Sequence, residues 1–415
     1  MKRIALFILL FTLFIITQAQ EKKKKFDFKF YGYVNTLFTY DTRQVVAARE
    51  DHILLYPENI KEKDGKDIND NHQFNIGVIQ TRFGAKIAGP NLWGAKTNGV
   101  IEAEFIGNSE ADVNGLRVRH AFMNFNWGKN SLLIGQTWSP FFTTECFPTQ
   151  VGANTGLPTQ AFSRNPQVRY TYKNNGFKFE AAILTQRDYT SRGPKSSADF
   201  NLMKSNSFLR NAALPITQAK VVYTGKKGSL IGLVGETKTI KPLIDIDETH
   251  TSFGVSAFAK LNLNPITIKA KTTYGSNLAD YLMLGGYAFK DANDVSYTQI
   301  YQHASWLDIE YNTGKFTYGI YAGFNKNLGS DDKIKFGENN AAEKKTIPYV
   351  YALGGNIDKL YRIAPRVRYA VKNVKFELEL ENTTAYYGTV DEKGKVKDTK
   401  DVTNYRTSLS VYYTF

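Results

Sequence analysis

Short stretches in which apolar and polar residues alternate recur along almost the whole chain. A period of two is typical of a β-strand that buries one face, because successive side chains of a strand point to opposite sides. The stretches are about ten residues long and are bounded by turn residues, as the strands of a transmembrane barrel require. We count sixteen of them, an even number as in single-chain bacterial barrels. They are residues 26–40, 74–88, 97–107, 115–127, 130–138, 165–173, 176–188, 214–224, 228–238, 251–263, 265–276, 296–311, 315–325, 359–371, 373–387 and 403–415.

The connections between these stretches are alternately short and long. The short ones, such as GKN at 128–130 and NNG at 174–176, are hairpin turns rich in glycine, asparagine and lysine. Short turns at one end and long loops at the other are typical of an outer-membrane barrel, whereas a soluble β-sandwich or solenoid would not require them. We therefore predict an all-β fold, a transmembrane antiparallel β-barrel with short periplasmic turns and long extracellular loops. The long loops are 41–73, 139–164, 189–213, 239–250, 277–295, 326–358 and 388–402.

The start of the chain indicates export. Residues 1–19 combine a basic start with an apolar stretch that is short for a membrane span, the pattern of a secretory signal peptide. We expect residues 20–25 to form a periplasmic tail and residues 26–415 to form the barrel, in the outer membrane of a bacterium.

The C-terminal residues alternate in the same way, with apolar side chains at every second position from Leu409 to Phe415. A last strand of this kind must close against the first one, because a barrel in lipid leaves no free edge. The terminal Phe415 also resembles the signal by which the barrel-assembly machinery recognises its substrates. We expect that machinery as a partner, together with the lipid and lipopolysaccharide around the barrel.

Composition and charge limit the classes of molecule that the chain can bind. Hydrophobic residues make up 42% and aromatic residues 14% of the 415 residues, and the formal net charge of +14 falls to +12 without the predicted signal peptide. A basic chain suits nucleic acid, an anionic membrane surface or anionic solutes, and export excludes nucleic acid. The single cysteine, Cys146, excludes an internal disulfide.

The informative charges lie inside predicted strands. In GLRVRHAF, Arg117 and Arg119 share one face, and Leu116 and Val118 share the other. An arginine on the lipid face costs roughly 2–4 kcal/mol near the membrane midplane. We therefore expect both arginines in the lumen. The two apolar residues then face lipid or a neighbouring subunit, and the mixed outer faces of the early strands favour the subunit contact.

Two later strands carry a denser pattern of charge. YRIAPRVRYAV puts three arginines on one face, and VKFELELEN puts one lysine and three glutamates on the polar face of the next strand. Two readings stay open: a salt-bridge ladder that stiffens the wall, or a charged track that solutes follow. The residues are Arg362, Arg366 and Arg368, then Lys375, Glu377, Glu379 and Glu381.

Catalytic and metal-binding motifs are weak. The five histidines are scattered, and no HExxH, CxxC or nucleophile-elbow motif occurs. His250 follows three acidic residues in DIDETH, and KDINDNH at 66–72 offers carboxylates without the glycine and terminal glutamate of an EF-hand loop. We interpret both as solvated loops. No enzymatic activity, cofactor or metal is predicted.

Residues 81–170 resemble a known family. The stretches TRFGAKIAGP, GVIEAEFIGN, LRVRHAFMNF and LLIGQTWSPFF, followed by a long loop and NPQVRYTY, are similar to the DcaP-like outer-membrane porins and, more distantly, to the phosphate-selective porins. The resemblance implies a trimeric channel associated with dicarboxylates. It also implies a sixteen-stranded barrel whose third long loop, here 139–164, folds into the pore. We expect no long helical N-terminal extension of the kind that some such porins carry, so no role of that segment is carried over.

Taken with this resemblance, the charges predict a passive porin for small anionic solutes, dicarboxylates among them. Glu145 is the one acidic residue of the inward loop, and we expect it to oppose Arg117 and Arg119. An adhesin whose long loops bind a ligand is the main alternative, and an outer-membrane hydrolase is a weaker one. The residues expected near the constriction are Arg82, Glu102, Glu104, Arg117, Arg119, Glu145 and Arg169, with Arg362, Arg366 and Arg368 along the solute track.

Overall fold

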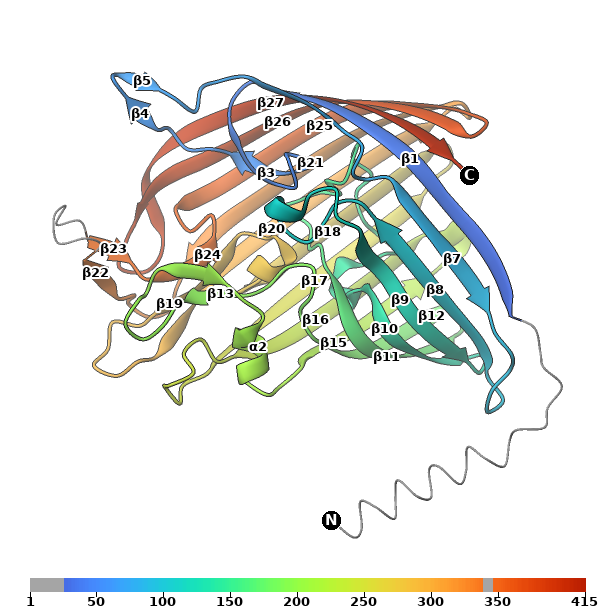
Figure 1. Ribbon diagram of the computed structural model, residues 1–415, viewed down its shortest axis with the longest axis horizontal. Helices are drawn as coiled ribbons and strands as arrows, with labels where there is room; N and C mark the ends of the chain where they lie inside the picture. The colour runs from blue at the N-terminus through green and yellow to red at the C-terminus, as the bar shows by residue number, and fades with distance from the viewer. Residues whose placement is uncertain (1–25, 339–345) are drawn as a thin grey trace, which may run out of the picture.

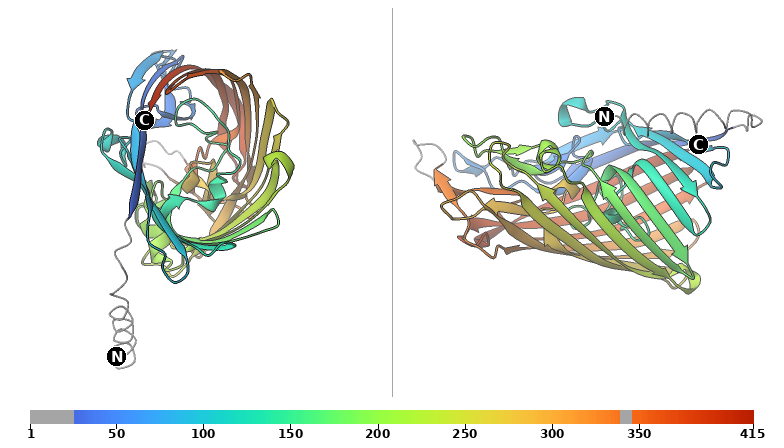
Figure 2. Two further views of the ribbon diagram at one scale, coloured as in Figure 1. Left: turned by 90° about the vertical axis from the view of Figure 1, so that its right-hand side faces the viewer. Right: turned by 90° about the horizontal axis from the view of Figure 1, so that it is seen from below.

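The computed structural model describes residues 26–338 and 346–415, and their strands form one closed antiparallel barrel (Figures 1 and 2). The predicted signal peptide and tail lie outside the described residues. Each strand lies beside its predecessor around the ring, as hairpin connections require. The wall consists of β1 (Asp27–Asp41), β6 (Gln73–Gly77) with β7 (Arg82–Ala88), β8 (Lys96–Glu104), β9 (Arg117–Asn126), β10 (Asn130–Trp138), β11 (Arg164–Asn174), β12 (Phe177–Leu184), β15 (Ile216–Thr224), β16 (Leu230–Ile240), β17 (His250–Asn262), β18 (Ile266–Ser276), β20 (Tyr297–Asn312), β21 (Phe316–Gly329), β25 (Ile357–Val371), β26 (Val374–Val390) and β27 (Val396–Thr414).

The sheet contains 19 hydrogen-bonded strands, which amount to sixteen crossings of the wall. β6 and β7 are two halves of one crossing, since both pair with β1. β19 (Gly285–Phe289) and β24 (Val350–Leu353) belong to long loops and pair with each other beyond the wall. The predicted all-β barrel of about sixteen strands is confirmed.

A bulge separates β6 from β7. Four residues, 78–81, span an interval that three residues of β1 span on the neighbouring strand. The side chain of Asn35 on β1 donates to Oε1 of Gln80 at 2.7 Å, and its backbone N–H donates to Oγ1 of Thr81 at 3.2 Å. The extra residue therefore turns the buried Gln80 into the lumen, as bulges re-aim side chains elsewhere.

The barrel closes between the first and last strands. β1 and β27 pair with Val34 opposite Tyr413, and two backbone hydrogen bonds of 3.0 and 3.1 Å join Gly32 to Phe415. Only glycine fits at position 32, because a Cβ there would overlap the ring of Phe415. The pairing runs from Tyr33 opposite Thr414 to Asp41 opposite Arg406, so the seam is closed along this length as a strand exposed to lipid requires.

Burial alternates along the strands as the sequence pattern predicts. On β27, Leu409 and Tyr413 are exposed, whereas Ser408 and Ser410 are buried in the barrel. Outward aromatic rings gather at two levels: Phe316 stacks on Tyr318 near one end of the strands, and Phe324 packs on Tyr361 near the other. Two aromatic levels are typical of membrane–water interfaces.

Strand length differs around the ring. β8, β9, β10 and β12 have 9, 10, 9 and 8 residues, whereas β26 and β27 have 17 and 19. The longer strands extend toward the end that carries the long loops, on the left in Figure 1. One side of the wall is therefore much lower than the opposite side.

The long loops contain short elements of their own. Among residues 26–338 and 346–415, no helix is long and apolar enough to cross a membrane. These elements are β2 (Val45–Ala48), β3 (Ile53–Pro57), β4 (Glu62–Lys63), β5 (Lys66–Asp67), η1 (Glu110–Asp112), η2 (Pro140–Phe142), β13 (Arg192–Pro194), β14 (Leu202–Lys204), α2 (Ser207–Asn211), η3 (Lys226–Gly228), η4 (Ala279–Tyr281), β22 (Phe336–Glu338) and β23 (Thr346–Pro348).

The largest apolar cluster lies inside the barrel. It joins residues of five loops, among them Ile53, Leu157 and Leu284, to inward residues of the wall such as Leu360 and Val402. Figure 2, left, shows these loop segments within the ring of strands. The lumen is therefore partly filled by folded loops, and any path for solutes must run beside them.

Candidate functional site: the lumen of the barrel

The segment between β10 and β11, residues 139–163, enters the barrel and is called the lumen loop below. Its first half binds the wall formed by β15 and β18. Nζ of Lys271 donates to the carbonyl of Phe141 at 2.8 Å, and Glu145 pairs with Lys220 at 3.0 Å. Both lysines are buried on the inward face of their strands. These contacts hold the loop inside the ring.

The second half of the lumen loop reaches the wall opposite its origin. The backbone N–H of Val151 donates to Glu379 at 3.3 Å, and the side chain of Gln150 donates to Glu381 at 3.2 Å. Nε1 of Trp306 on β20 donates to Gln160 at 3.0 Å. The loop thus crosses the lumen, and on the side of β7–β10 a cavity remains between it and the wall.

The wall of β7–β10 carries a compact cluster of ion pairs. Nη2 of Arg117 lies 2.6 Å from Oε1 of Glu104, and Nη1 of Arg119 lies 2.7 Å from the other oxygen of the same carboxylate. Arg119 also pairs with Glu102 at 2.6 Å. As predicted from the alternation, both arginines point inward and are at most 5% exposed.

Three further charged residues complete this cluster. Arg82 pairs with Glu104 at 3.1 Å, and its guanidinium stacks over the ring of Tyr33. Arg164, at the start of β11, pairs with Asp188 at 2.9 Å and stacks over Trp138. We call Arg82, Arg117, Arg119, Arg164, Glu102, Glu104 and Asp188 the arginine cluster. Its four guanidinium groups outnumber its three carboxylates by one.

A cavity of about 370 Å³ adjoins the arginine cluster. The strands contribute Arg82, Arg117 and Arg119 to its lining, and the lumen loop contributes Thr144 and Phe147. Within the described residues, Nε of Arg82 and Nη1 of Arg117 are buried without a hydrogen-bond partner. Each lies near a carboxylate of the cluster without a hydrogen bond to it: Nε of Arg82 is 3.5 Å from Glu102, and Nη1 of Arg117 is 3.9 Å from Asp188.

Glu145 lies elsewhere than the sequence suggested. It was expected to oppose Arg117 and Arg119, but it pairs with Lys178 and Lys220 on the wall of β12 and β15. Glu180 also binds Lys220, at 2.6 Å, and draws Arg169 to 3.8 Å. Arg169 therefore belongs to this second group of charges and not to the arginine cluster.

Two of the three arginines of β25, Arg362 and Arg368, hold the lumen loop, and Arg366 is paired on the wall. Arg366 pairs with Asp308 at 2.6 Å, and Arg368 pairs with Glu377 at 2.6 Å and donates to the carbonyl of Thr149. Arg362 is fully buried and donates to the carbonyl of Leu157. Of the two readings of this pattern, the contacts favour a salt-bridge ladder. A role of these arginines along a solute track stays a prediction.

Sequence reasoning missed part of the charged lining. Lys178, Lys220 and Lys271 occupy inward positions of alternating strands, so the same face argument that found Arg117 would have found them. Arg164 and Asp188 lie where strands meet loops, and no periodicity marks such positions. Their pairing depends on how the loops return to the wall.

Neither the candidate catalytic histidine, His250, nor the candidate cation-binding segment at 66–72 has the neighbours that its function would require. His250 stacks on Tyr287 with ring centroids 4.7 Å apart, and Asp247 pairs with Lys241 instead. Asp67 of the KDINDNH segment pairs with Arg43 at 2.8 Å. Among the residues that the structure describes, no group of three or more potential ligands could hold a metal ion.

The outer surface of β8–β12 is apolar and hollowed. Leu116 and Val118 point outward and are 58% and 51% exposed. A groove of about 620 Å³ lies on β7–β10, and its lining includes Gly99, Ala121 and Gly135. Small outward residues and a concave apolar face suit contact with another protein surface better than contact with lipid chains alone.

Comparison by sequence supports the resemblance seen in the motifs. Residues 18–188 match the family described as DcaP outer membrane protein. No curated protein matches the chain. The predicted similarity to the DcaP family is confirmed over this part of the chain, and with it the location in the outer membrane.

Comparison of folds extends the similarity to the whole barrel. The outer membrane channel DcaP of Acinetobacter baumannii has a TM-score of 0.70 at 20% identity, covering 95% of this chain and 99% of that one. An anion-selective porin from Comamonas acidovorans has a TM-score of 0.59 at 10% identity, over 94% and 100%. The trimer form of OmpT from Vibrio cholerae has a TM-score of 0.54 at 11% identity, over 94% and 100%.

Proposed function

We propose that this chain, whose residues 18–188 match the DcaP outer membrane protein family, is a passive porin for small anionic solutes, dicarboxylates included. The observation that carries the proposal is the arginine cluster, with its excess of one guanidinium, beside the 370 Å³ cavity that Arg82, Arg117 and Arg119 line. Guanidinium groups bind carboxylates through paired hydrogen bonds. A solute that passes the lumen loop on this side meets them first.

The balance of charge sets the expected strength of selectivity. Glu102 and Glu104 neutralise much of the arginine charge, so the field in the cavity is positive without excluding cations completely. Selectivity in a pore depends on radius and on such fields. We therefore propose weak to moderate anion preference, with Arg117 and Arg119 as its main source and Arg82 as the more accessible contact.

The position of the lumen loop supports a channel over an adhesin. An adhesin requires its long loops at the surface, whereas this loop is buried by ion pairs and hydrogen bonds inside the ring. The matched family and folds are those of outer-membrane channels and porins, which supports the absence of an enzymatic role.

We also propose a homotrimer. Its subunits meet through the side of the barrel that is built from the short strands β8, β9, β10 and β12, which we call the low wall. Short strands, outward Leu116 and Val118, and the concave apolar groove lie together on β8–β12. Lipid and lipopolysaccharide then surround the remaining wall. The seam at Phe415 is proposed as the element that the barrel-assembly machinery recognises.

The test is a zero-current potential in planar bilayers under a salt gradient. Arg82→Gln and the double variant Arg117→Ala/Arg119→Ala should both move the potential toward cation preference and slow dicarboxylate entry. Lys375→Ala is the matched control, because Lys375 pairs with Glu377 in the lumen but does not line the cavity. Equal potentials in wild type and both arginine variants would refute the assignment.

A further inference from the structure

Strands β1 and β7 continue beyond the arginine cluster, toward the end of the barrel that carries the short turns. Tyr33 and Arg82 are register partners on these strands, and both line the 370 Å³ cavity. Because inward positions recur every second residue, the next ones on β1 in that direction are Tyr31 and Lys29. Lys86 is the register partner of Lys29 on β7. These two lysines, called the lysine pair below, end the inward face and have no part in the channel proposal.

The contacts of Lys86 direct it into the barrel. Its Nζ lies over the ring of Tyr31, 5.4 Å from the centroid, and the hydroxyl of Tyr31 donates to Oε2 of Glu102 at 2.9 Å. The other oxygen of that carboxylate, Oε1, lies 2.6 Å from Arg119. The negative face of an aromatic ring attracts an ammonium group above it. Lys86 is thus connected to the arginine cluster through one tyrosine and one glutamate.

The position of the Tyr31 ring depends on a glycine of the neighbouring strand. Gly84 is the register partner of Tyr31, and it separates Arg82 from Lys86 on the inward face of β7. A Cβ at this glycine would lie 2.9 Å from both Cζ and Oη of Tyr31 and 2.7 Å from the carbonyl oxygen of Ile101. The ring therefore occupies the interval between the two cations of β7, because no side chain stands there.

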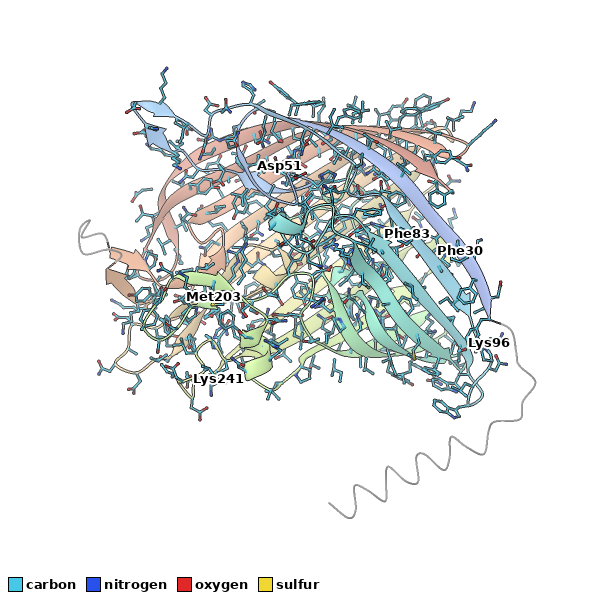
Figure 3. All side chains as sticks on the ribbon, in the orientation of Figure 1. Phe30, Asp51, Phe83, Lys96, Met203 and Lys241 are labelled. Carbon is cyan, nitrogen blue, oxygen red and sulfur yellow. The ribbon has the colours of Figure 1, made fainter. Side chains whose placement is uncertain are left out.

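The lysine pair lies at the mouth of the barrel. Figure 3 shows Phe30 and Phe83 on the same two strands, toward the end that Lys96 marks and away from the long loops. Both lysines of the pair are exposed, and their like charges are directly opposed, which is unfavourable and is relieved by an anion between them. Among residues 26–338 and 346–415, no carboxylate lies within 4.0 Å of either ammonium group, not even that of Asp27, one inward position further along β1. The pair therefore presents two ammonium groups to solutes at this mouth.

We propose that the lysine pair is a second carboxylate site on the solute path, at the periplasmic mouth, and that Tyr31 is the residue that positions Lys86. The proposal rests on the proposed channel function, because it extends the path from the arginine cluster to the periplasm. A lysine acts as a point charge, whereas the planar fork of an arginine matches a carboxylate. The lysine pair thus attracts anions at the mouth, and the arginine cluster discriminates among them.

The test measures how often a dicarboxylate interrupts the current of single channels. Glutarate is added to one chamber at a time, at about 0.1 M and about 1 M salt, where the Debye length is about 10 Å and about 3 Å. All channels carry a biotin on Asp247→Cys, in an exposed loop at the other end, so that streptavidin bound there lowers the current and marks the extracellular chamber. The variant is Lys29→Gln/Lys86→Gln. The matched control is Lys129→Gln, because Lys129 is exposed in the short turn between β9 and β10.

We expect Lys29→Gln/Lys86→Gln to lower the rate of interruption by periplasmic glutarate about three- to tenfold at the lower salt concentration and less than about twofold at the higher one, because exposed charges steer solutes only within the Debye length. The rate from the extracellular chamber and the duration of each interruption should stay the same, since the arginine cluster is unchanged. Tyr31→Leu should lower the periplasmic rate as Lys86→Gln alone does, and Tyr31→Phe, which keeps the ring under the ammonium group, should retain most of the rate. Folding of each variant is checked by the heat-dependent mobility shift of the barrel.

Three outcomes would overturn the second site. They are equal periplasmic rates in the wild type and the lysine variant, a loss of rate that does not depend on salt, and an equal loss in the Lys129→Gln control. In each case a shorter interruption in Arg117→Ala/Arg119→Ala would leave the channel proposal intact. Wild-type channels that conduct but do not respond to glutarate from either chamber would instead refute the dicarboxylate proposal, and the second site with it.

Discussion

Nη2 of Arg117 lies 2.6 Å from Oε1 of Glu104, and the two side chains are 2% and 0% exposed. The same carboxylate also binds Arg119 and Arg82, so one buried glutamate organises three arginines. Buried charges are costly unless they are paired, and removal of one partner leaves the others without compensation. The position of the arginines that line the cavity therefore depends on Glu104, a carboxylate that is itself fully buried.

Replacing that glutamate should destabilise the barrel. Glu104→Ala leaves Arg117 without its main partner and should lower the free energy of unfolding by about 3–5 kcal/mol. The double variant Glu104→Ala/Arg117→Ala should be less destabilised than the sum of the single variants, by about 0.5–3 kcal/mol. Urea unfolding of the barrel in lipid vesicles measures all three, and strict additivity would show that the pair is not coupled.

A charge on the low wall should break the oligomer. Leu116→Lys or Val118→Lys introduces an ammonium group into the proposed subunit contact, which should convert trimers to monomers on native gels while the heat-dependent mobility shift persists. Leu307→Lys is the control, because Leu307 is an exposed outward residue of β20 on a distant part of the wall. Loss of trimers in the control alone would place the contact elsewhere.

Removal of the last residue should impair assembly. A chain without Phe415 loses two backbone hydrogen bonds to Gly32, each worth about 0.5–1.5 kcal/mol in net terms. Folding into vesicles from urea should slow modestly, whereas the yield in cells should fall further if the assembly machinery recognises this ring. An equal loss in both measurements would indicate that Phe415 contributes only to the pairing of the first and last strands and is not recognised by the assembly machinery.

The wall of the barrel could be predicted because its pattern is local. Alternation assigns each strand residue to the lumen or to the outside, and it correctly directed Arg117 inward and Val118 outward. The number of strands followed from the same period. The bulge at 78–81 escaped notice, since one extra residue leaves the local composition unchanged.

The interior could be predicted only in part, because loops find their partners through tertiary packing. Nothing near Glu145 in the sequence indicates Lys220, which lies 75 residues away and meets it only when the loop crosses the lumen. The same holds for Arg164 and Asp188. The family resemblance supplied an inward loop, but no pattern in the sequence indicated that Ile53 to Tyr56 of the first long loop are also buried inside the barrel.

The uneven height of the wall has a consequence for a lone subunit in a bilayer. At about 3.4 Å per residue and a tilt of about 45°, a nine-residue strand rises only about 22 Å, short of an apolar band of about 25 Å. β8 and β10 have nine residues each, whereas β27 has 19. Hydrophobic mismatch of this kind is relieved by local thinning, by leaning, or by association. A solitary barrel would therefore deform the lipid on one side only. In the proposed trimer each subunit would cover the short side of its neighbours, and this deformation would disappear.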